Sequence, residues 1–273
     1  MNILAIYAHP DDAEFFASGS LSKWASEGHE IYAICCTNGN MGTHDNKLSS
    51  EELASIRQKE LSSAMKVIGG HEPIGFWFPD GYLRKYRQEL KEKLSYWIRK
   101  LKPNRIITFD PWQQYEIHPD HMEAGLITSE VATFTAFPLF FPDQISDELS
   151  PHQTQELWYM VPTSRKVNRI VDITNTFDKK VKSLLCHRSQ LPLLSDILLP
   201  GIDPYTITDD ELSDIENSIS DLLSMLSSSI GNNFEIDLAE AFYCVKCSLG
   251  HFDDAFEKMS EVFSNIDEDA EIH

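Results

Sequence analysis

Two short segments combine residue types that bind metal ions and transfer protons. The first is His9-Pro10-Asp11-Asp12, and the second is His118-Pro119-Asp120-His121. Pro10 fixes its own φ angle and restricts His9, so the first segment forms a shaped turn rather than the interior of a helix. Around such a turn, His9 and Asp12 can direct an imidazole nitrogen and a carboxylate oxygen at one ion.

The second segment is expected at the start of a helix, just after a strand that ends near Asp110. If His121 reaches the same ion, two histidines and one carboxylate hold it and leave a position open for water. That ligand set suits catalytic zinc, and it also suits non-haem iron(II), so the identity of the metal stays open. One His-Pro-Asp turn alone is more typical of a helix cap, but two of them after strands indicate a shared metal site.

The first half of the chain contains the elements that must position these residues. Short β-rich runs alternate with longer helical stretches, a pattern that predicts a mostly parallel sheet with helices on both faces. In such a doubly wound α/β fold, ligands bind beyond the carboxyl ends of the strands. Strands are expected at Ile3 to Ala8, Glu30 to Thr37, Ile74 to Phe78 and Arg105 to Phe109, with helices through Leu21 to Ala25, Leu53 to Val67 and Lys85 to Leu101.

The pattern changes beyond about Pro192, and we expect a helical C-terminal extension over residues 192–273 after a catalytic domain over residues 1–191. Thr208 is expected to cap an acidic amphipathic helix that continues to Leu226, and a loop is expected at Ser227 to Asn233. Two further helices are predicted at Phe234 to Ser248 and Phe252 to Phe263. The stretch LGHFDDAF between them faintly resembles one tetratricopeptide hairpin.

Composition narrows the class of protein. The 273 residues carry 23 Lys plus Arg against 43 Asp plus Glu, a formal charge of −20 that opposes binding of nucleic acid. We expect no membrane span and no secretion signal, and therefore a cytoplasmic protein with reduced thiols. The G-x-G-x-x-G signature of dinucleotide enzymes is absent from the sequence. The sequence leaves the oligomeric state open, with a homo-oligomer among the options.

The sequence AHPDDAEF followed by HPDH resembles the LmbE-like, or PIG-L, family of metal-dependent deacetylases. The resemblance extends from Met1 to about Leu191 and includes looser matches at Thr37-Asn38-Gly39, Pro79-Asp80-Gly81, VDIT and HRSQ. It implies a Rossmann-like three-layer α/β/α sandwich and hydrolysis of N-acetyl groups on amino sugars.

The resemblance also implies roles for individual residues. Zinc would be bound at His9, Asp12 and His121. The position of the catalytic base falls on Asp11, and His118 is expected to stabilise the oxyanion. Positions that contact the sugar fall on Arg57 and Asp80. Many members have Glu directly after the two Asp residues, whereas here Ala13 precedes Glu14, so the role of Glu14 stays open.

The expected function is therefore zinc-dependent removal of an acetyl group from an amino sugar or its conjugate, with Fe²⁺ or another divalent ion as the alternative metal. The acidic charge favours a cationic substrate, for example an acetylated aminoglycoside-type precursor in natural-product biosynthesis. One alternative is an amidase that cleaves a larger acyl or peptide-like amide with the same metal centre. Another is a non-enzymatic binding protein that uses the C-terminal helical hairpin.

Overall fold

The computed structural model describes residues 1–114, 116–160, 167–193 and 209–247. These residues form one seven-stranded sheet with the order β3-β2-β1-β4-β5-β7-β6. The first five strands are parallel, whereas β7 runs antiparallel to both of its neighbours. The strands are β1 (Asn2–Tyr7), β2 (Glu30–Thr37), β3 (Ile74–Phe78), β4 (Arg105–Phe109), β5 (Glu156–Met160), β6 (Arg169–Asp172) and β7 (Ala239–Lys246).

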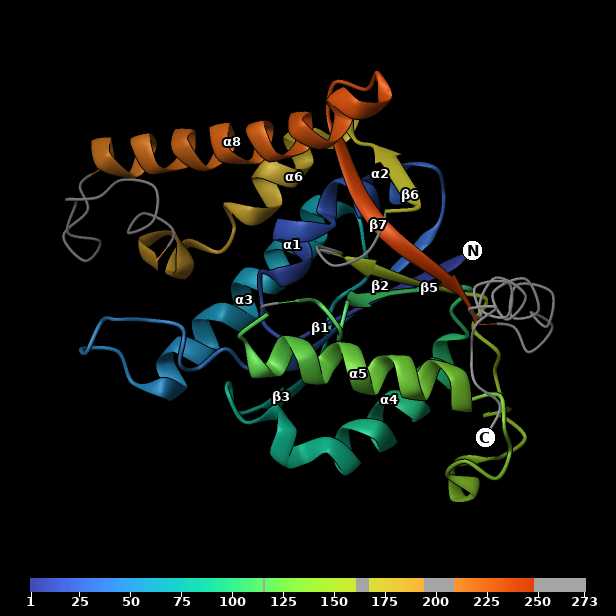
Figure 1. Cartoon of the computed structure of the whole chain (residues 1–273). Coiled ribbons are helices and arrows are strands. Elements are labelled where there is room, and N and C mark those ends of the chain that lie inside the picture. The colour runs from blue at the N-terminus through green and yellow to red at the C-terminus, as the bar shows by residue number, and fades with distance from the viewer. Residues whose placement is uncertain (115, 161–166, 194–208, 248–273) are drawn as a thin grey trace, which may run out of the picture.

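Helices cover both faces of the sheet, which gives the three-layer α/β arrangement that the sequence predicted (Figure 1). The α4 and α5 helices pack together on one face, and α2, α3 and α6 pack together on the other. The long α8 helix contacts β7 and α6. The bounds are α1 (Asp12–Phe16), α2 (Ser18–Ser26), α3 (Ser50–Ile68), α4 (Arg87–Leu101), α5 (Pro119–Phe134), α6 (Phe177–Leu184) and α8 (Asp209–Gly231).

The central strands are apolar because helices cover both of their faces. Ile3, Leu4 and Ile6 of β1 are fully buried, so this strand lacks the alternation of a half-exposed one. The start of α3 is fixed by a capping box that Ser49 and Glu52 form. The described strands and helices of the first 110 residues therefore lie close to their expected positions.

The predicted helix at Phe234 to Ser248 is wrong, since Ala239–Lys246 forms strand β7 between β5 and β6. Leu238, Ala241, Phe242 and Val245 fit a helical period, but a run of eight residues with aromatic and β-branched side chains fits a strand equally well. Pairing with β5 and β6 satisfies the backbone hydrogen-bonding groups of β7, and it therefore favours the strand over the helix.

The loop expected at Ser227 to Asn233 is also partly wrong, because α8 continues to Gly231. Thr208, the helix at Phe252 to Phe263 and the LGHFDDAF stretch lie outside the described residues. The division of the chain at residues 191 and 192 stays a prediction, although β7 belongs to the same sheet as β1. Within the described part of the chain, no helix has the length and apolar character needed to cross a bilayer.

Candidate metal centre and active site

The two motifs meet at the carboxyl ends of neighbouring strands. His9 follows β1, and the segment that leads to His118 follows β4, which pairs with β1 in parallel. The sheet order reverses between these strands, because β2 and β3 extend to one side and β5 to the other. Doubly wound folds bind ligands in the crevice at such a reversal. The topology therefore brings together residues more than a hundred positions apart.

Three imidazoles cluster in this crevice. Nitrogen atoms of His9, His118 and His121 lie within 4.8 Å of one another. The His9 ring centroid lies 4.4 Å from that of His118 and 5.1 Å from that of His121. His118 was expected only in catalysis, yet its nitrogen is as well placed for an ion as those of the other two histidines.

Asp12 lies between two of these imidazoles. Its Oδ2 accepts a hydrogen bond from the His9 backbone N–H at 2.7 Å and lies 3.5 Å from His9 Nδ1. Its Oδ1 lies 3.4 Å from His121 Nε2. Two imidazole nitrogens within 3.5 Å of one carboxylate match the donor types of a catalytic zinc or non-haem iron site. The residues present thus fit a divalent metal ion.

The electrostatics of these groups favour positive charge between them. Burial raises the pKa of Asp12, but His121 and His9 outweigh it and hold that pKa well below its usual range. Burial lowers the pKa of His9, yet Asp12, Asp120 and Asp80 bring it well above the usual value. Asp12 likewise raises the pKa of His121 against the effect of burial. Protons and a metal ion compete for such a site.

Two buried carboxylates lie on the far edge of the His9 ring. His9 Nε2 is 3.1 Å from Asp80 Oδ1 and 3.5 Å from Asp120 Oδ2. His9 Nδ1 faces Asp12, while its Nε2 faces Asp80 and Asp120. In metal sites, carboxylates placed like Asp80 and Asp120 orient the histidine ligands. Asp80 is only 5% exposed, and the sugar contact expected for it stays a prediction.

Asp120 and Glu116 are functional candidates that the sequence analysis did not single out. Asp120 accepts hydrogen bonds from the backbone N–H groups of Gly81 at 2.6 Å and Leu83 at 3.0 Å, so it ties the loop after β3 to the site. Glu116 Oε2 lies 3.4 Å from His121 Nδ1 and can orient that ring. A signal for Asp120 was its place inside the HPDH motif, whereas the sequence around Glu116 gave no comparable signal.

Asp11 adopts an unusual backbone conformation at the entrance of α1. Its φ is 125° and its ψ is −22°, a region that non-glycine residues rarely occupy and that often marks a functional site. Its side chain is 25% exposed and lies at a small cavity of about 200 Å³ that Asp12 also lines. Burial raises the pKa of Asp11 and Asp12 adds to this, while Arg57 lowers it. A carboxyl group with a raised pKa suits proton transfer.

Arg57 of α3 holds the Asp11 turn in place. Its Nη2 lies 3.1 Å from Asp11 Oδ2 and donates to the Pro10 carbonyl oxygen at 2.6 Å, and its Nη1 donates to the Gly39 carbonyl oxygen at 3.0 Å. A side chain at position 39, where φ is +61°, would overlap the guanidinium. Arg57 is only 3% exposed, so the observed contacts are with the turn, and its expected sugar contact stays a prediction.

His118 is the N-cap residue of α5. Its Nδ1 accepts a hydrogen bond from the Asp120 backbone N–H at 3.3 Å, so a neutral ring carries its proton on Nε2. Burial lowers the pKa of His118, and His9 and His121 lower it further. A neutral imidazole with a free N–H can donate to a developing oxyanion, while its N-cap contact also fits a structural role.

Glu14 of α1 lies beside His187. Its side chain is fully buried, and among the described residues neither carboxylate oxygen has a hydrogen-bond partner. His187 of the HRSQ stretch has its Nε2 3.5 Å from Glu14 Oε2. Burial lowers the pKa of His187, but Glu14 and Asp11 bring it above the usual value. The ion-pair partner of Glu14 in the described residues is therefore His187 and none of the candidate metal ligands.

Comparisons with known proteins show which family the chain resembles. The model of the PIG-L family, described as GlcNAc-PI de-N-acetylase, matches residues 4–132. A diacetylchitobiose deacetylase of Thermococcus kodakarensis is 32% identical over 190 residues, which cover 70% of this chain and 70% of that protein. A 1D-myo-inositol 2-acetamido-2-deoxy-alpha-D-glucopyranoside deacetylase of Mycobacteroides abscessus is 24% identical, over 71% of this chain and 83% of that protein.

The fold has a close counterpart among solved structures. The N,N'-diacetylchitobiose deacetylase from Pyrococcus horikoshii, complexed with its inhibitor MPG, superposes with a TM-score of 0.75 and 28% identity. The superposition covers 93% of this chain and 88% of that one. The fold and the clustered HPDD and HPDH motifs define an α/β protein of the LmbE-like type. The chain belongs to the PIG-L family.

Proposed function

We propose that this protein is a metal-dependent hydrolase that removes the N-acetyl group from an amino sugar or an amino-sugar conjugate. The observation that carries the proposal is the convergence of His9, Asp12 and His121 beside Asp11 in its strained turn. The relatives named as deacetylases of acetylated sugars support the same reaction class. We propose zinc as the native metal and Fe²⁺ as the alternative.

His9, Asp12 and His121 would hold the ion. Such an ion supplies a Lewis acid that polarises the amide carbonyl and makes water a stronger nucleophile at neutral pH. Asp11 would accept the proton of the attacking water and return it to the leaving amine. His118, with its proton on Nε2, would donate to the oxyanion, which is worth about 3 kcal/mol for one good donor.

Arg57 and Asp80 have supporting roles in this scheme. Arg57 fixes the position of the Asp11 carboxylate and keeps its pKa from rising further. Asp80 and Asp120, which lie 3.1 and 3.5 Å from His9 Nε2, would orient the ring of His9. Direct contacts of Arg57 or Asp80 with the sugar remain part of the proposal, and they require movement of these buried side chains when substrate binds.

The acidic charge of −20 supports the further proposal that the substrate is cationic, such as an acetylated aminoglycoside-type precursor in natural-product biosynthesis. Such steering depends on ionic strength. We therefore expect kcat/KM for an amine-bearing N-acetyl sugar to fall as salt rises from 20 to 500 mM. Faster turnover of an anionic N-acetyl sugar at low salt would contradict this part of the proposal.

The test of the reaction is a screen of the metal-loaded full chain against N-acetylglucosamine conjugates, with free amine and acetate both measured. Asp11→Asn is expected to keep the metal and lose most of the turnover, whereas His121→Ala is expected to lose the metal as well. Lys59→Gln, at an exposed position of α3, is the control, and we expect it to change neither the metal content nor the turnover. A near-normal rate in purified Asp11→Asn would remove Asp11 as the base.

An amidase for larger acyl groups stays the second candidate because an apolar cavity adjoins the site, as described below. The non-enzymatic alternative depended on a C-terminal helical hairpin. Its first helix is replaced by β7, so it has lost part of its support.

A further inference from the structure

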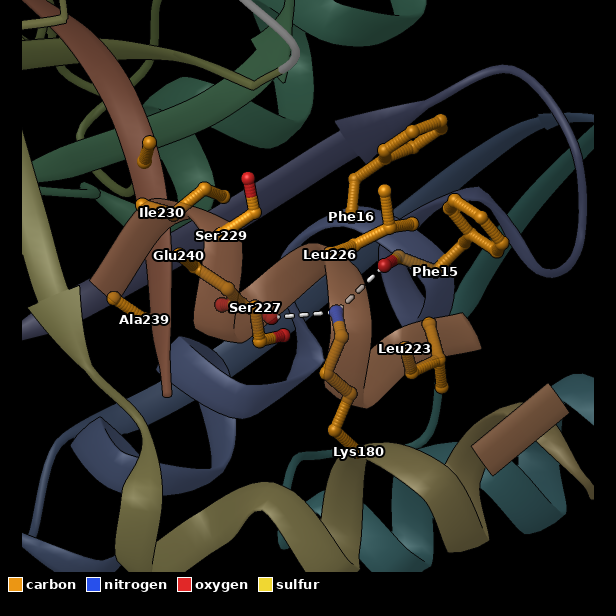
Figure 2. A pocket seen from close by; sticks show the side chains of 11 residues that line it. Phe15, Phe16, Lys180, Leu223, Leu226, Ser227, Ser229, Ile230, Ala239 and Glu240 are labelled. Atoms are coloured by element: carbon orange, nitrogen blue, oxygen red, sulfur yellow. Dashed lines mark hydrogen bonds and ion pairs between the residues drawn. The ribbon is translucent and has the colours of Figure 1, made fainter. Parts of the chain in front are cut away.

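A mostly apolar hollow lies next to the small cavity at the catalytic turn. It has a volume of about 430 Å³, within the range of small-ligand pockets of about 300–1,000 Å³. Residues from α1, α6, α8 and β7 line it (Figure 2). They are Phe15, Phe16, Lys180, Leu223, Leu226, Ser227, Ser229, Ile230, Ala239, Glu240 and Ala241.

This α8 cavity shares two lining residues with the small cavity at the catalytic turn. Phe15 and Phe16 line both, and the small cavity is also lined by Asp11 and Asp12. The two phenylalanines belong to α1, which begins at Asp12. Both cavities therefore border α1.

The two charged groups of the α8 cavity, Lys180 and Glu240, are paired with each other. Lys180 Nζ lies 2.6 Å from Glu240 Oε1 and donates to the Phe15 carbonyl oxygen at 2.6 Å, as the dashed lines in Figure 2 show. Glu240 also accepts hydrogen bonds from the backbone N–H groups of Gly19 at 3.1 Å and Ser20 at 2.8 Å. This buried pair joins α1, α2, α6 and β7 and makes one wall of the cavity.

Most of the remaining lining is apolar, which decides the chemistry of the occupant. Leu223, Leu226 and Phe15 gather on one side of the Lys180 ammonium group in Figure 2. A sugar ring placed here would lose hydration of several hydroxyl groups with few partners to replace it. A hydrocarbon chain would instead gain from burial, since each methylene group contributes favourably on leaving water.

We infer that the α8 cavity binds an alkyl chain carried by the substrate of the adjacent catalytic centre. This inference rests on the proposed deacylation at Asp11 for the statement that the chain belongs to a substrate. The chain can be attached in two ways, as an alkyl group on the sugar's anomeric oxygen or as a longer N-acyl group. The chemistry that the cavity recognises is the same in both.

The test uses two substrate series with the full-length, metal-loaded protein. One series comprises methyl, butyl, hexyl and octyl glycosides of N-acetylglucosamine, and the other comprises methyl glucosaminide with N-acetyl, N-butanoyl, N-hexanoyl or N-octanoyl groups. Calorimetric binding is measured with Asp11→Asn, and turnover with the unsubstituted chain. Because one methylene is worth about fourfold in affinity, Kd is expected to fall by about that factor per methylene in the series that reaches the cavity.

Two matched substitutions on α8 assign the effect to the cavity. Ser229 lines it, whereas its neighbour Ser228 does not, and both side chains are at least partly exposed. Ser229→Trp is expected to abolish the dependence on chain length, while Ser228→Trp is expected to keep it. If Ser229→Trp fails to fold by circular dichroism, Ala241→Phe narrows the cavity from β7 and carries the same expectation.

The outcomes separate this inference from the proposed function. Turnover of the methyl compounds without any effect of chain length in either series would overturn the inference alone. An equal loss of the chain-length effect in Ser228→Trp and Ser229→Trp would also overturn it. A third outcome is binding that depends on chain length and is abolished by Ser229→Trp, but with no turnover of any compound. This outcome would support the cavity as an alkyl site and contradict the proposed reaction.

Discussion

Replacing Arg57 with Gln tests how the catalytic turn is held. The guanidinium donates two hydrogen bonds to the carbonyl oxygens of Pro10 and Gly39 and pairs with Asp11. Hydrogen bonds to charged groups are worth about 1.5–3 kcal/mol each, and Gln can replace one of them at most. Because the Asp11 side chain is 25% exposed, solvent screens part of the ion pair and its share is small.

We therefore expect Arg57→Gln to lower the free energy of unfolding by about 3 kcal/mol, or the melting temperature by roughly 6–12 °C. We expect kcat to fall about 100-fold, since a displacement of a catalytic group by 1 Å has an effect of that size. Arg57 lowers the pKa of Asp11, so its loss raises that pKa and moves the acid limb of the kcat/KM profile to higher pH.

Denaturant unfolding, calorimetry and a pH series of acetate release measure these effects, and Lys59→Gln removes a positive charge from an exposed position of the same helix as a control. Arg57→Lys keeps the positive charge but loses the planar guanidinium. We therefore expect its free energy of unfolding and its kcat to lie between those of Arg57→Gln and those of the original chain. The reasoning is refuted if Arg57→Gln unfolds within about 0.5 kcal/mol of the original chain or keeps its kcat.

Three further changes test the fold that carries the site. Gly125→Ala in α5 is expected to lower stability by about 2 kcal/mol in denaturant unfolding, because its Cβ would overlap the carbonyl oxygen of Phe109 at the end of β4; an unchanged midpoint would contradict this. Ser49→Ala is expected to lower stability by about 1 kcal/mol through loss of the α3 capping box, and Ser49→Asp should restore it. Burial lowers the pKa of His152 in the folded state despite its contact with the Pro103 carbonyl oxygen, so the unfolded chain binds the proton more readily. Stability should therefore fall as the pH drops below about 6.5, and His152→Gln should show a smaller fall over the same range.

The sequence predicted the elements that position the site because their signals are local. A buried apolar run such as Ile3 to Ala8 and a helical stretch such as Leu53 to Val67 identify a strand and a helix without knowledge of the rest of the chain. The paired His-Pro-Asp segments identified the candidate ligands in the same way. Their meeting at the carboxyl ends of β1 and β4 follows from the rule that parallel strands present these ends at one edge.

What the sequence could not predict depends on contacts between distant segments. Ala239–Lys246 becomes a strand only because β5 and β6 offer pairing partners on both sides. The orientation of Arg57 is set by carbonyl oxygens in two separate loops, at Pro10 and Gly39, and no spacing along the chain encodes it. The α8 cavity likewise exists only once α8 and β7 pack beside α1.

The central claim is that one divalent ion is held by residues from both motifs. Its most direct test is equilibrium titration of the chelator-treated full chain with Zn²⁺, in the presence of a competing chromophoric chelator. We expect one ion per chain. Replacing a residue that only orients a ligand lowers metal affinity by about 10–100-fold, and we expect a larger loss in His9→Ala, Asp12→Ala and His121→Ala. Absence of stoichiometric binding, or unchanged affinity in the His121→Ala chain, would contradict the account.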